Sequence, residues 1–160
     1  MTQPVRYHLN ILIDSRRRAA GTPGSFEYVL GDAVRVPTGA TAFLTCTRWT
    51  VDVSGITLAD RAGRPLQLHV NELDTAGRTL DMSRGGVPVS CVAYIPTIHT
   101  AFDIARMSSL GAHPVAVPAG LNMRRFGVSV LNGDGTVCDD CGEWEADLAI
   151  TVSAMPPGVL

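Results

Sequence analysis

Hydrophobic and polar residues alternate with a period of two along most of the chain. Alternation of this kind places successive side chains on opposite faces of a strand, one face toward a core and the other toward water. The pattern therefore predicts half-buried β-strands. The alternating runs are residues 7–13, 26–30, 43–53, 66–70, 87–95, 126–130 and 144–152.

The phase of each run predicts which side chains face the core. In the last run, Trp144, Ala146, Leu148, Ile150 and Val152 share one phase, and mostly acidic residues and threonine share the other. In the run 43–53, the predicted inward phase comprises Phe43, Thr45, Thr47, Trp49, Val51 and Val53.

Clusters of glycine and proline separate the runs and supply the backbone angles that turns require. They lie at residues 21–24, 37–39, 63–65, 85–86, 118–120 and 132–135. The sequence Asn132-Gly133-Asp134-Gly135 falls between two alternating runs and predicts a hairpin. The one stretch that could form a helix is 100–110, and it is short.

About seven to nine short strands with turn-rich links are typical of a β-sandwich or barrel. The longer links after Ile13 and around residues 96–120 favour Greek-key connections. We therefore predict an all-β fold, a single jelly roll of two antiparallel sheets, in one domain spanning residues 1–160. Residues 153–160 are expected to form an extended C-terminal tail.

Composition limits the classes of function. The chain has 160 residues, of which 46% are hydrophobic and 18% charged, with a net charge of −2. These values exclude a disordered chain and argue against binding nucleic acid through general positive charge. The first residues do not resemble a secretory signal, and no apolar run approaches the roughly 18 residues of a membrane helix. We expect a soluble protein with mostly free thiols, made in a reducing cytoplasm.

All 13 basic residues are arginine. A GC-rich genome accounts for this bias, but the absence of lysine also has chemical consequences. It removes Schiff-base chemistry and the lysine of a phosphate-binding loop. Arginine becomes the cation available for contacts with other subunits.

Two cysteines form the strongest local motif, Cys138-Asp-Asp-Cys141. Two thiolates at this spacing can supply half of a tetrahedral zinc site, but no second paired motif follows. Exposed loop thiols without a metal are the preferred interpretation. A calcium site built from Asn132, Asp134, Asp139 and Asp140 is a further alternative, although these residues also suit a turn.

No catalytic group is recognisable. His8 and His69 fall on the polar phase of their runs and are expected to be exposed, while His99 and His113 have no partner at a characteristic spacing. Glu143 and Glu145 share one strand face, where they are expected to be solvating charges. We therefore predict neither an enzyme nor a cofactor.

The run Arg16-Arg17-Arg18 is the one local basic cluster. It follows the first predicted strand, so it lies in a loop. Either it contacts a partner through salt bridges or phosphate groups, or it is a solvated loop.

Two parts of the chain resemble jelly-roll minor capsid and penton proteins of large double-stranded DNA viruses, virophages and Polinton-like viruses. The first part is Ile13-Asp-Ser-Arg-Arg-Arg18 followed by Ser25-Phe-Glu-Tyr-Val-Leu30. The second is the segment 126–135 with its Asp-Gly turn, followed by Gly142-Glu-Trp-Glu145, in which Trp144 would be a large buried anchor. Residues 55–120 match only as alternating strands, and the Cys138/Cys141 pair departs from the pattern.

The resemblance implies a structural protein of a viral capsid, a penton or a minor capsid or cement protein, without catalytic residues. Its partners would be the major capsid protein, other minor capsid proteins or further copies of itself, within a virion capsid assembled in the host cell cytoplasm. Hydrophobic residues on predicted wet faces, and the C-terminal tail, are expected to meet other subunits. These candidates are Leu12, Val29, Leu44, Val92, Tyr94 and the tail residues 155–160, including Val159 and Leu160.

Two other functions stay open. A ligand- or carbohydrate-binding β-sandwich would need a row of exposed aromatic side chains. A small enzyme of the cupin type would need a compact metal set, which His69, Glu72 and His99 do not assemble in sequence.

Overall fold

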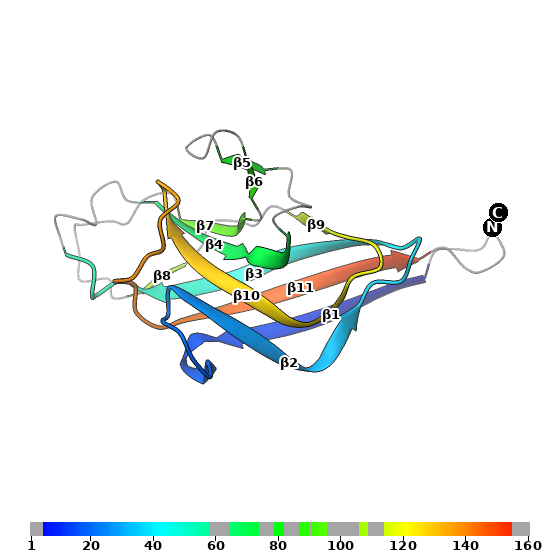
Figure 1. Cartoon of the computed structure of the whole chain (residues 1–160), viewed down its shortest axis with the longest axis horizontal. Coiled ribbons are helices and arrows are strands. Elements are labelled where there is room, and N and C mark those ends of the chain that lie inside the picture. Colours follow the sequence, from blue (N-terminus) through cyan, green and yellow to red (C-terminus); the bar gives the residue numbers. More distant parts are fainter. Residues whose placement is uncertain are drawn as a thin grey trace.

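Two antiparallel sheets face each other in the computed structural model (Figure 1). The structure describes residues 5–57, 65–73, 79–81, 87–89, 91–95, 106–108 and 114–154. The first sheet contains, in spatial order, β1 (Val5–Asp14), β11 (Trp144–Ala154), β3 (Thr41–Asp52) and then β8 (Arg106–Ser108) and β9 (Val115–Val117). The second contains β2 (Ser25–Arg35), β10 (Asn122–Asn132), β4 (Leu66–Val70) and β7 (Cys91–Ile95).

The strand order is that of a jelly roll. β8 pairs with residues 50–52 of β3 and β9 with residues 42–44, so the two occupy one strand position along β3. Successive strand positions then alternate between the sheets except for positions 4 and 5, β4 and β7, which are neighbours in the second sheet, giving the orders 1-8-3-6 and 2-7-4-5. This confirms the predicted all-β fold of two antiparallel sheets with Greek-key crossings.

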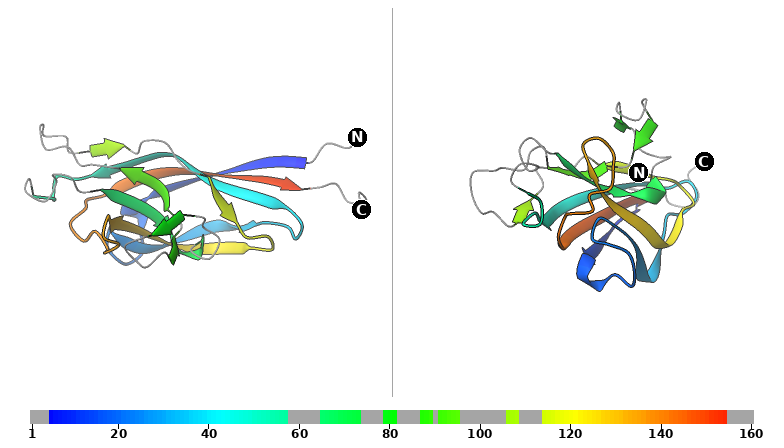
Figure 2. Two further views of the ribbon diagram at one scale, coloured as in Figure 1. Left: turned by 90° about the horizontal axis from the view of Figure 1, so that it is seen from above. Right: turned by 60° about the vertical axis from the view of Figure 1, so that its left-hand side comes forward.

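Short elements accompany the two sheets. β5 (Thr79–Asp81) and β6 (Val87–Val89) pair with each other as a separate ribbon. The 3-10 helices are η1 (Ser15–Arg17), which follows β1, and η2 (Asn71–Leu73), which follows β4. Figure 2 shows that β1 begins and β11 ends at the same end of the sandwich, where Val5 pairs with Ala154.

The inward faces of the two sheets form the core. The predicted inward phase of β11 is confirmed, because Trp144, Ala146, Leu148, Ile150 and Val152 are all buried. Trp144 lies 5.4 Å from Phe26 between ring centroids, and its indole nitrogen donates a hydrogen bond to the carbonyl oxygen of Pro23 at 2.6 Å. The side chain therefore connects the two sheets, as an anchor in the last strand requires.

The predicted phase of β3 is wrong in its first half. Leu44 and Cys46 are buried and Phe43 is 46% exposed, whereas Trp49 and Val51 are buried as predicted. The pairing with β11 shifts by one residue at this point: Asp147 faces Arg48, but Leu148 faces Cys46. This bulge adds one residue to β3 and exchanges the two faces of the strand.

The run 7–13 is only partly buried. Ile11 and Ile13 are in the core, but Tyr7 and Leu9, in the same phase, are more than one-third exposed. They lie toward the end where the chain enters the edge strand β1, which has a sheet neighbour on one side only in the described structure.

The run 87–95 does not form one strand. Residues 87–89 form β6 in the separate ribbon, whereas residues 91–95 form β7 in the second sheet. Val92, expected on a wet face, is buried, as is Leu44.

The helix expected at 100–110 is contradicted where the structure describes it. Residues 106–108 form strand β8 and pair with β3. The other residues of that stretch lie outside the described residues.

The turn at 132–135 is confirmed, and it closes a short hairpin in which Leu131 bridges Val137 and the amide of Cys138 donates to the carbonyl of Val130 at 2.8 Å. The amide of Gly135 donates to the carbonyl of Asn132 at 2.9 Å, and Gly135 has a positive φ of 85°. However, β10 and β11 belong to different sheets, so the segment crosses between layers.

The first two residues of the expected tail are part of a strand. Ser153 and Ala154 belong to β11 and pair with β1. Residues 155–160, with Val159 and Leu160, lie outside the described residues.

Candidate interaction surface

Helix η1 is held against the start of β11 by ion pairs. Asp14 caps η1, since its Oδ1 accepts from the Arg16 amide at 3.0 Å and from Arg16 Nε at 2.8 Å. The Arg16 guanidinium also binds the carboxylate of Glu145. The hydrogen bond from Arg16 is the main reason that the pKa of Asp14 is lowered.

A second group of contacts is centred on Glu143. Arg18 Nη1 donates to its two carboxylate oxygens at 2.8 and 2.7 Å, and the hydroxyl of Ser15 donates to the same carboxylate. Ser15 is fully buried and accepts a hydrogen bond from the Trp144 amide at 2.8 Å. Burial raises the pKa of Glu143, but the hydrogen bonds from Arg18 and Ser15 outweigh it and leave the pKa lowered.

These contacts revise the interpretation of the charged residues. Glu143 and Glu145, expected to be solvating charges, bind arginines of the η1 segment. Arg17 is 81% exposed, and its Nε lies 3.9 Å from Asp14 Oδ2. Of the basic cluster, Arg17 is thus the side chain most available to a partner.

The thiols of Cys138 and Cys141 are buried, so the prediction that they are exposed in a loop is wrong. Cys141 Sγ donates to the carbonyl of Cys138 at 3.1 Å, and Cys138 Sγ donates to Asp140 Oδ1 at 3.3 Å. The neighbouring Cys138 thiol and burial together raise the pKa of Cys141. The described residues contain no group of three or more histidine, cysteine, aspartate or glutamate side chains able to hold a metal ion.

The loop before these thiols uses its polar side chains for its own backbone. Asp134 Oδ1 accepts from the amide and hydroxyl of Thr136 at 2.9 and 2.6 Å. Asn132 Nδ2 donates to the hydroxyl of Thr136 at 2.9 Å. This arrangement matches the turn interpretation of these residues rather than the calcium alternative.

One histidine prediction is wrong. His69 is buried, and its Nε2 lies 2.9 Å from Oε1 of Gln67, two residues earlier on the same face of β4. His8 is exposed as predicted, with Nδ1 3.0 Å from the Thr151 hydroxyl. His99 and His113 lie outside the described residues.

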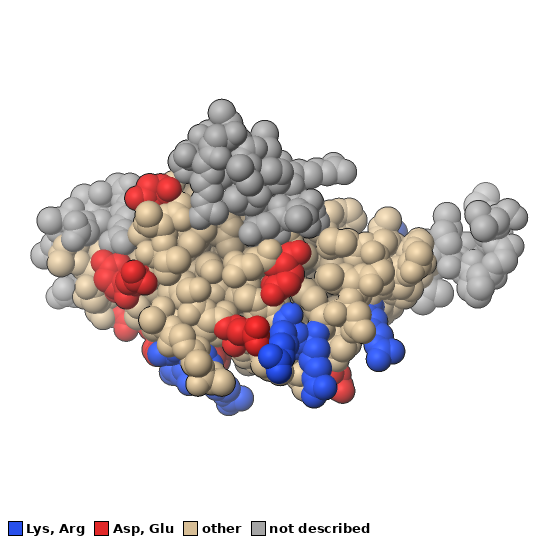
Figure 3. Space-filling model, in the orientation of Figure 1, with Lys and Arg blue, Asp and Glu red and all other residues tan. Residues whose placement is uncertain are grey.

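Large hydrophobic side chains are exposed on both sheets. Leu12 is 58% exposed on β1, Val29 is 50% exposed on β2, and Tyr94 is exposed on β7. Charged side chains cover only part of the face shown in Figure 3, and much of the rest is uncharged. Monomeric proteins tolerate single exposed hydrophobic residues, so the significance of these side chains depends on where they lie.

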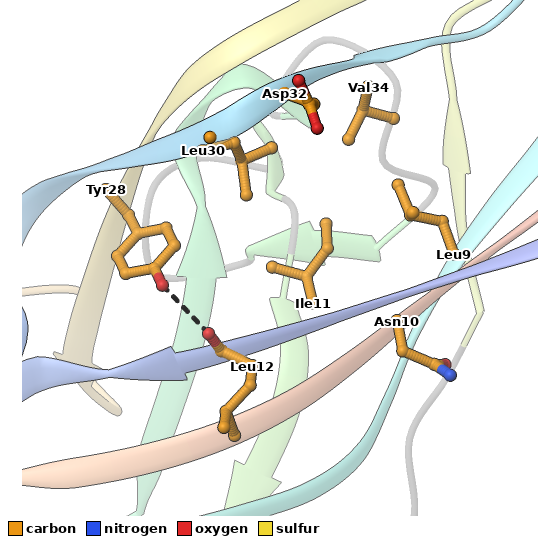
Figure 4. Close-up of a pocket in the computed structure, with 9 residues that line it drawn as sticks. Leu9, Asn10, Ile11, Leu12, Tyr28, Leu30, Asp32 and Val34 are labelled. Carbon is orange, nitrogen blue, oxygen red and sulfur yellow. Dashed lines mark hydrogen bonds between the residues drawn. The ribbon is translucent and has the colours of Figure 1, made fainter.

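Several of them lie where the edge strands β1 and β2 run along one side of the sandwich. Two tyrosines cross between these strands: Tyr7 of β1 donates to the carbonyl of Arg35 at 3.0 Å, and Tyr28 of β2 donates to the carbonyl of Leu12 at 3.1 Å. Between them lies an open groove of about 280 Å³ (Figure 4). Its walls are Leu9, Asn10, Ile11, Leu12, Tyr28, Leu30, Gly31, Asp32 and Val34.

The groove is lined by the part of β2 in which that strand departs from regular pairing with β10. Met123 of β10 faces Val34, but Arg125 faces Val29, so residues 30–33 of β2 stand opposite Arg124 alone. Figure 1 shows that β2 is bent. Alternation of residues 26–30 carries no signal of this irregularity.

No family model matches the chain, and no curated protein matches it. Three solved structures are similar at 10% identity. The cyanophage Pam1 capsid asymmetric unit has a TM-score of 0.33 and is aligned over 96% of this chain and 87% of that chain. The acid-stable capsid of Helicobacter pylori bacteriophage KHP30 has a TM-score of 0.28, with 93% of each chain aligned.

The third is the infectious bursal disease virus VP2 subviral particle, with a TM-score of 0.28 over 94% of this chain and 33% of that chain. Likenesses this weak carry no argument about function, and the jelly-roll assignment rests on strand order. Among the described residues, no helix has the length and apolar character needed to cross a membrane.

Proposed function

We propose that this chain is a structural protein of a viral capsid, a penton or a minor capsid or cement protein. It acts by assembly with other proteins and performs no catalysis. Its partners are the major capsid protein, other minor capsid proteins or further copies of itself. On this proposal it is one domain over residues 1–160, and it resides in the virion capsid after assembly in the host cell cytoplasm.

The observation that carries the proposal is the pattern of exposed hydrophobic side chains on a jelly roll. Leu12, Val29 and Phe43 are each about half exposed, and they lie on strands of both sheets. A subunit enclosed by neighbours tolerates such residues because association buries them, whereas a free monomer exposes them to water. Jelly rolls also occur in lectins and cupins, so the fold alone does not decide the function.

The candidate contact residues divide by position. Arg17 and Tyr94 are exposed and available to a neighbour. Arg16 and Arg18 have intramolecular ion pairs, so a partner would share or displace them. Val159 and Leu160 remain candidates from the sequence.

The direct test is to purify particles from the source of this sequence and analyse their proteins by mass spectrometry. The proposal expects this chain at a fixed ratio to the major shell protein, and cryo-electron microscopy should place its jelly roll in the shell. Particles that lack the chain, or contain it only in traces that vary between preparations, would exclude the proposal.

The alternative of a carbohydrate-binding module has less support. Its exposed aromatic side chains among the described residues, Tyr7, Phe43 and Tyr94, lie on three strands, β1, β3 and β7. Phe43 and Tyr94 belong to different sheets, so these rings do not form one stacking row. Binding to a glycan array would revive this alternative.

A further inference from the structure

Strand β1 is a long edge strand without the usual protection. It has 10 residues and pairs continuously with β11 alone in the described structure, with no register shift. Natural edge strands avoid association by being short, by containing a bulge, proline or lysine, or by being covered. The sequence of β1, VRYHLNILID, contains neither proline nor lysine, and its charged residues, Arg6 and Asp14, lie near its two ends.

The hydrogen-bonding groups on the open side of β1 can be identified. The carbonyl of Leu12 accepts from the hydroxyl of Tyr28, so it points away from β11. In an antiparallel pair the backbone groups of alternate residues point to the same side. The amides and carbonyls of Arg6, His8 and Asn10 therefore also point outward and can receive another strand.

The residues of β1 whose backbone groups point outward can pair with the same residues of a second copy in one antiparallel register. If Asn10 faces Asn10 of a second copy, His8 faces Leu12 of that copy, and Arg6 faces Asp14. Arg6 is exposed, and Asp14 offers Oδ2, which is 3.9 Å from Arg17, while its Oδ1 binds Arg16. The register thus places opposite charges together at both ends of the pair.

The same register covers exposed hydrophobic side chains. Leu12 would lie against the imidazole of His8 of the second copy. Leu9, one of the walls of the groove, would lie beside Ile11 of that copy in a closely spaced, non-hydrogen-bonded pair. The Leu12 carbonyl keeps a second lone pair for the new strand while it accepts from Tyr28.

We propose that two copies of this chain associate through β1, antiparallel and centred on Asn10, so that their first sheets become one continuous sheet. The contact is isologous, since each copy uses the same residues, 6–14. The inference rests on the proposed function, because it names one contact by which such a protein assembles with itself.

Cysteine cross-linking tests the register. In this pairing the two Asn10 Cα atoms are about 5.5 Å apart, within disulfide reach. The Asn10→Cys variant should give a disulfide-linked dimer of twice 17.0 kDa with oxidised glutathione. The His8→Cys and Leu12→Cys variants should each stay monomeric on a non-reducing gel, since like positions lie four residues apart, or about 13 Å.

A mixture of the His8→Cys and Leu12→Cys variants should form the linked dimer, because these positions face each other. The wild type is the control for its own four cysteines. Equal cross-linking of all three single variants, or none in the Asn10→Cys variant, would overturn the register.

Charge substitution tests the contact without covalent cross-linking. Asn10→Asp and Asn10→Lys each place like charges face to face, so each variant should show half the mass of the wild type by light scattering. Mixing the two variants should restore the wild-type mass. Thr41→Asp, at an exposed position on β3 in the same sheet, is the matched control and should leave the mass unchanged.

A wild type that is monomeric at millimolar concentration would overturn the inference, as would variants that keep the wild-type mass or a Thr41→Asp variant that dissociates equally. Particle analysis separates this failure from failure of the proposed function. A chain present in particles but monomeric in solution excludes the β1 contact alone, whereas a β1 dimer absent from particles excludes the capsid role.

Discussion

The guanidinium of Arg18 donates from one nitrogen to both carboxylate oxygens of Glu143, a residue 125 positions further along the chain. Each side chain is partly shielded from water, with 22% and 36% of its surface exposed. The contact ties the segment after β1 to the start of β11. Four features of the molecule, beginning with this one, lead to measurable expectations.

Loss of the Arg18 side chain should destabilise the protein. Arg18→Ala removes the charged hydrogen bonds to Glu143 and those to the backbone at Ser15 and Gly21. Because the pair is partly exposed, we expect a loss of about 1–2 kcal/mol in the free energy of unfolding. Urea denaturation measures it. Arg17→Ala is the matched control and should change stability by less than about 0.5 kcal/mol; equal losses would contradict the assignment.

The contribution of Glu143 should depend on pH. Burial raises its pKa, but the hydrogen bonds from Arg18 and Ser15 lower the pKa by more than burial raises it. The folded pKa therefore lies below the unfolded value. A carboxylate whose pKa is lower in the folded state stabilises the protein when the pH lies above its unfolded pKa. That stabilisation is lost as the pH falls through the folded pKa.

Unfolding of the wild type and of Glu143→Gln should therefore be compared between pH 7 and pH 3. The difference in free energy of unfolding should be largest near neutrality and shrink below about pH 4.5, as the carboxyl is protonated first in the unfolded state and then, at lower pH, in the folded state. Glu27→Gln removes a more exposed pair with Arg125 and serves as the control. A difference for Glu143→Gln that is constant over this range would show that its charge is not what matters.

Gly24 should tolerate no side chain. A Cβ at this position would lie 2.3 Å from the carbonyl oxygen of Cys138, which is backbone and has little freedom to move. Gly24→Ala should cost more than about 2 kcal/mol or prevent folding. Gly31 has no atom within 4 Å of the equivalent Cβ, so Gly31→Ala should be close to neutral. Thermal unfolding by circular dichroism compares them, and similar melting temperatures would contradict the close approach.

The thiols should react slowly in the folded protein. Cys46, Cys138 and Cys141 are buried, and burial raises the pKa of Cys46 to about 12 and that of Cys91 to about 11. Little reactive thiolate is therefore present at pH 8. Titration with Ellman's reagent should show slow reaction when folded and four thiols in denaturant. Two thiols that react at once in the folded state would restore the exposed-loop interpretation of Cys138 and Cys141.

Local sequence signals predicted those features that depend on neighbours along the chain. The alternation in β11 correctly identified its buried face, because this strand keeps an unbroken alternation on its own side of the pairing. The glycine-rich segment at 132–135 correctly predicted a turn, since the special backbone angle at Gly135 is a local requirement. The exposed Leu12, Val29 and Tyr94 were also recognised from their phase.

Features that depend on distant partners were not predictable in this way. The phase change in β3 arises from a register shift against β11, and His69 is buried although it lies on the polar phase of its run. Nothing in the immediate sequence of Glu143 indicates that its charge is used by an arginine from the other end of the chain.

The sequence by itself determined that the chain forms strands in which hydrophobic and polar residues alternate. It also determined that turns join these strands and that each strand has a hydrophobic face for the core between two sheets. Those properties follow from side-chain periodicity and backbone preference, which act over a few residues. The tertiary structure decided which strands became neighbours, where bulges exchanged their faces, and which charges and thiols were withdrawn from water. Among the described strands it also left β1 and β2 at the open edges of their sheets, beside a groove, because the crossing order that completes the two sheets places the first two strands at their margins.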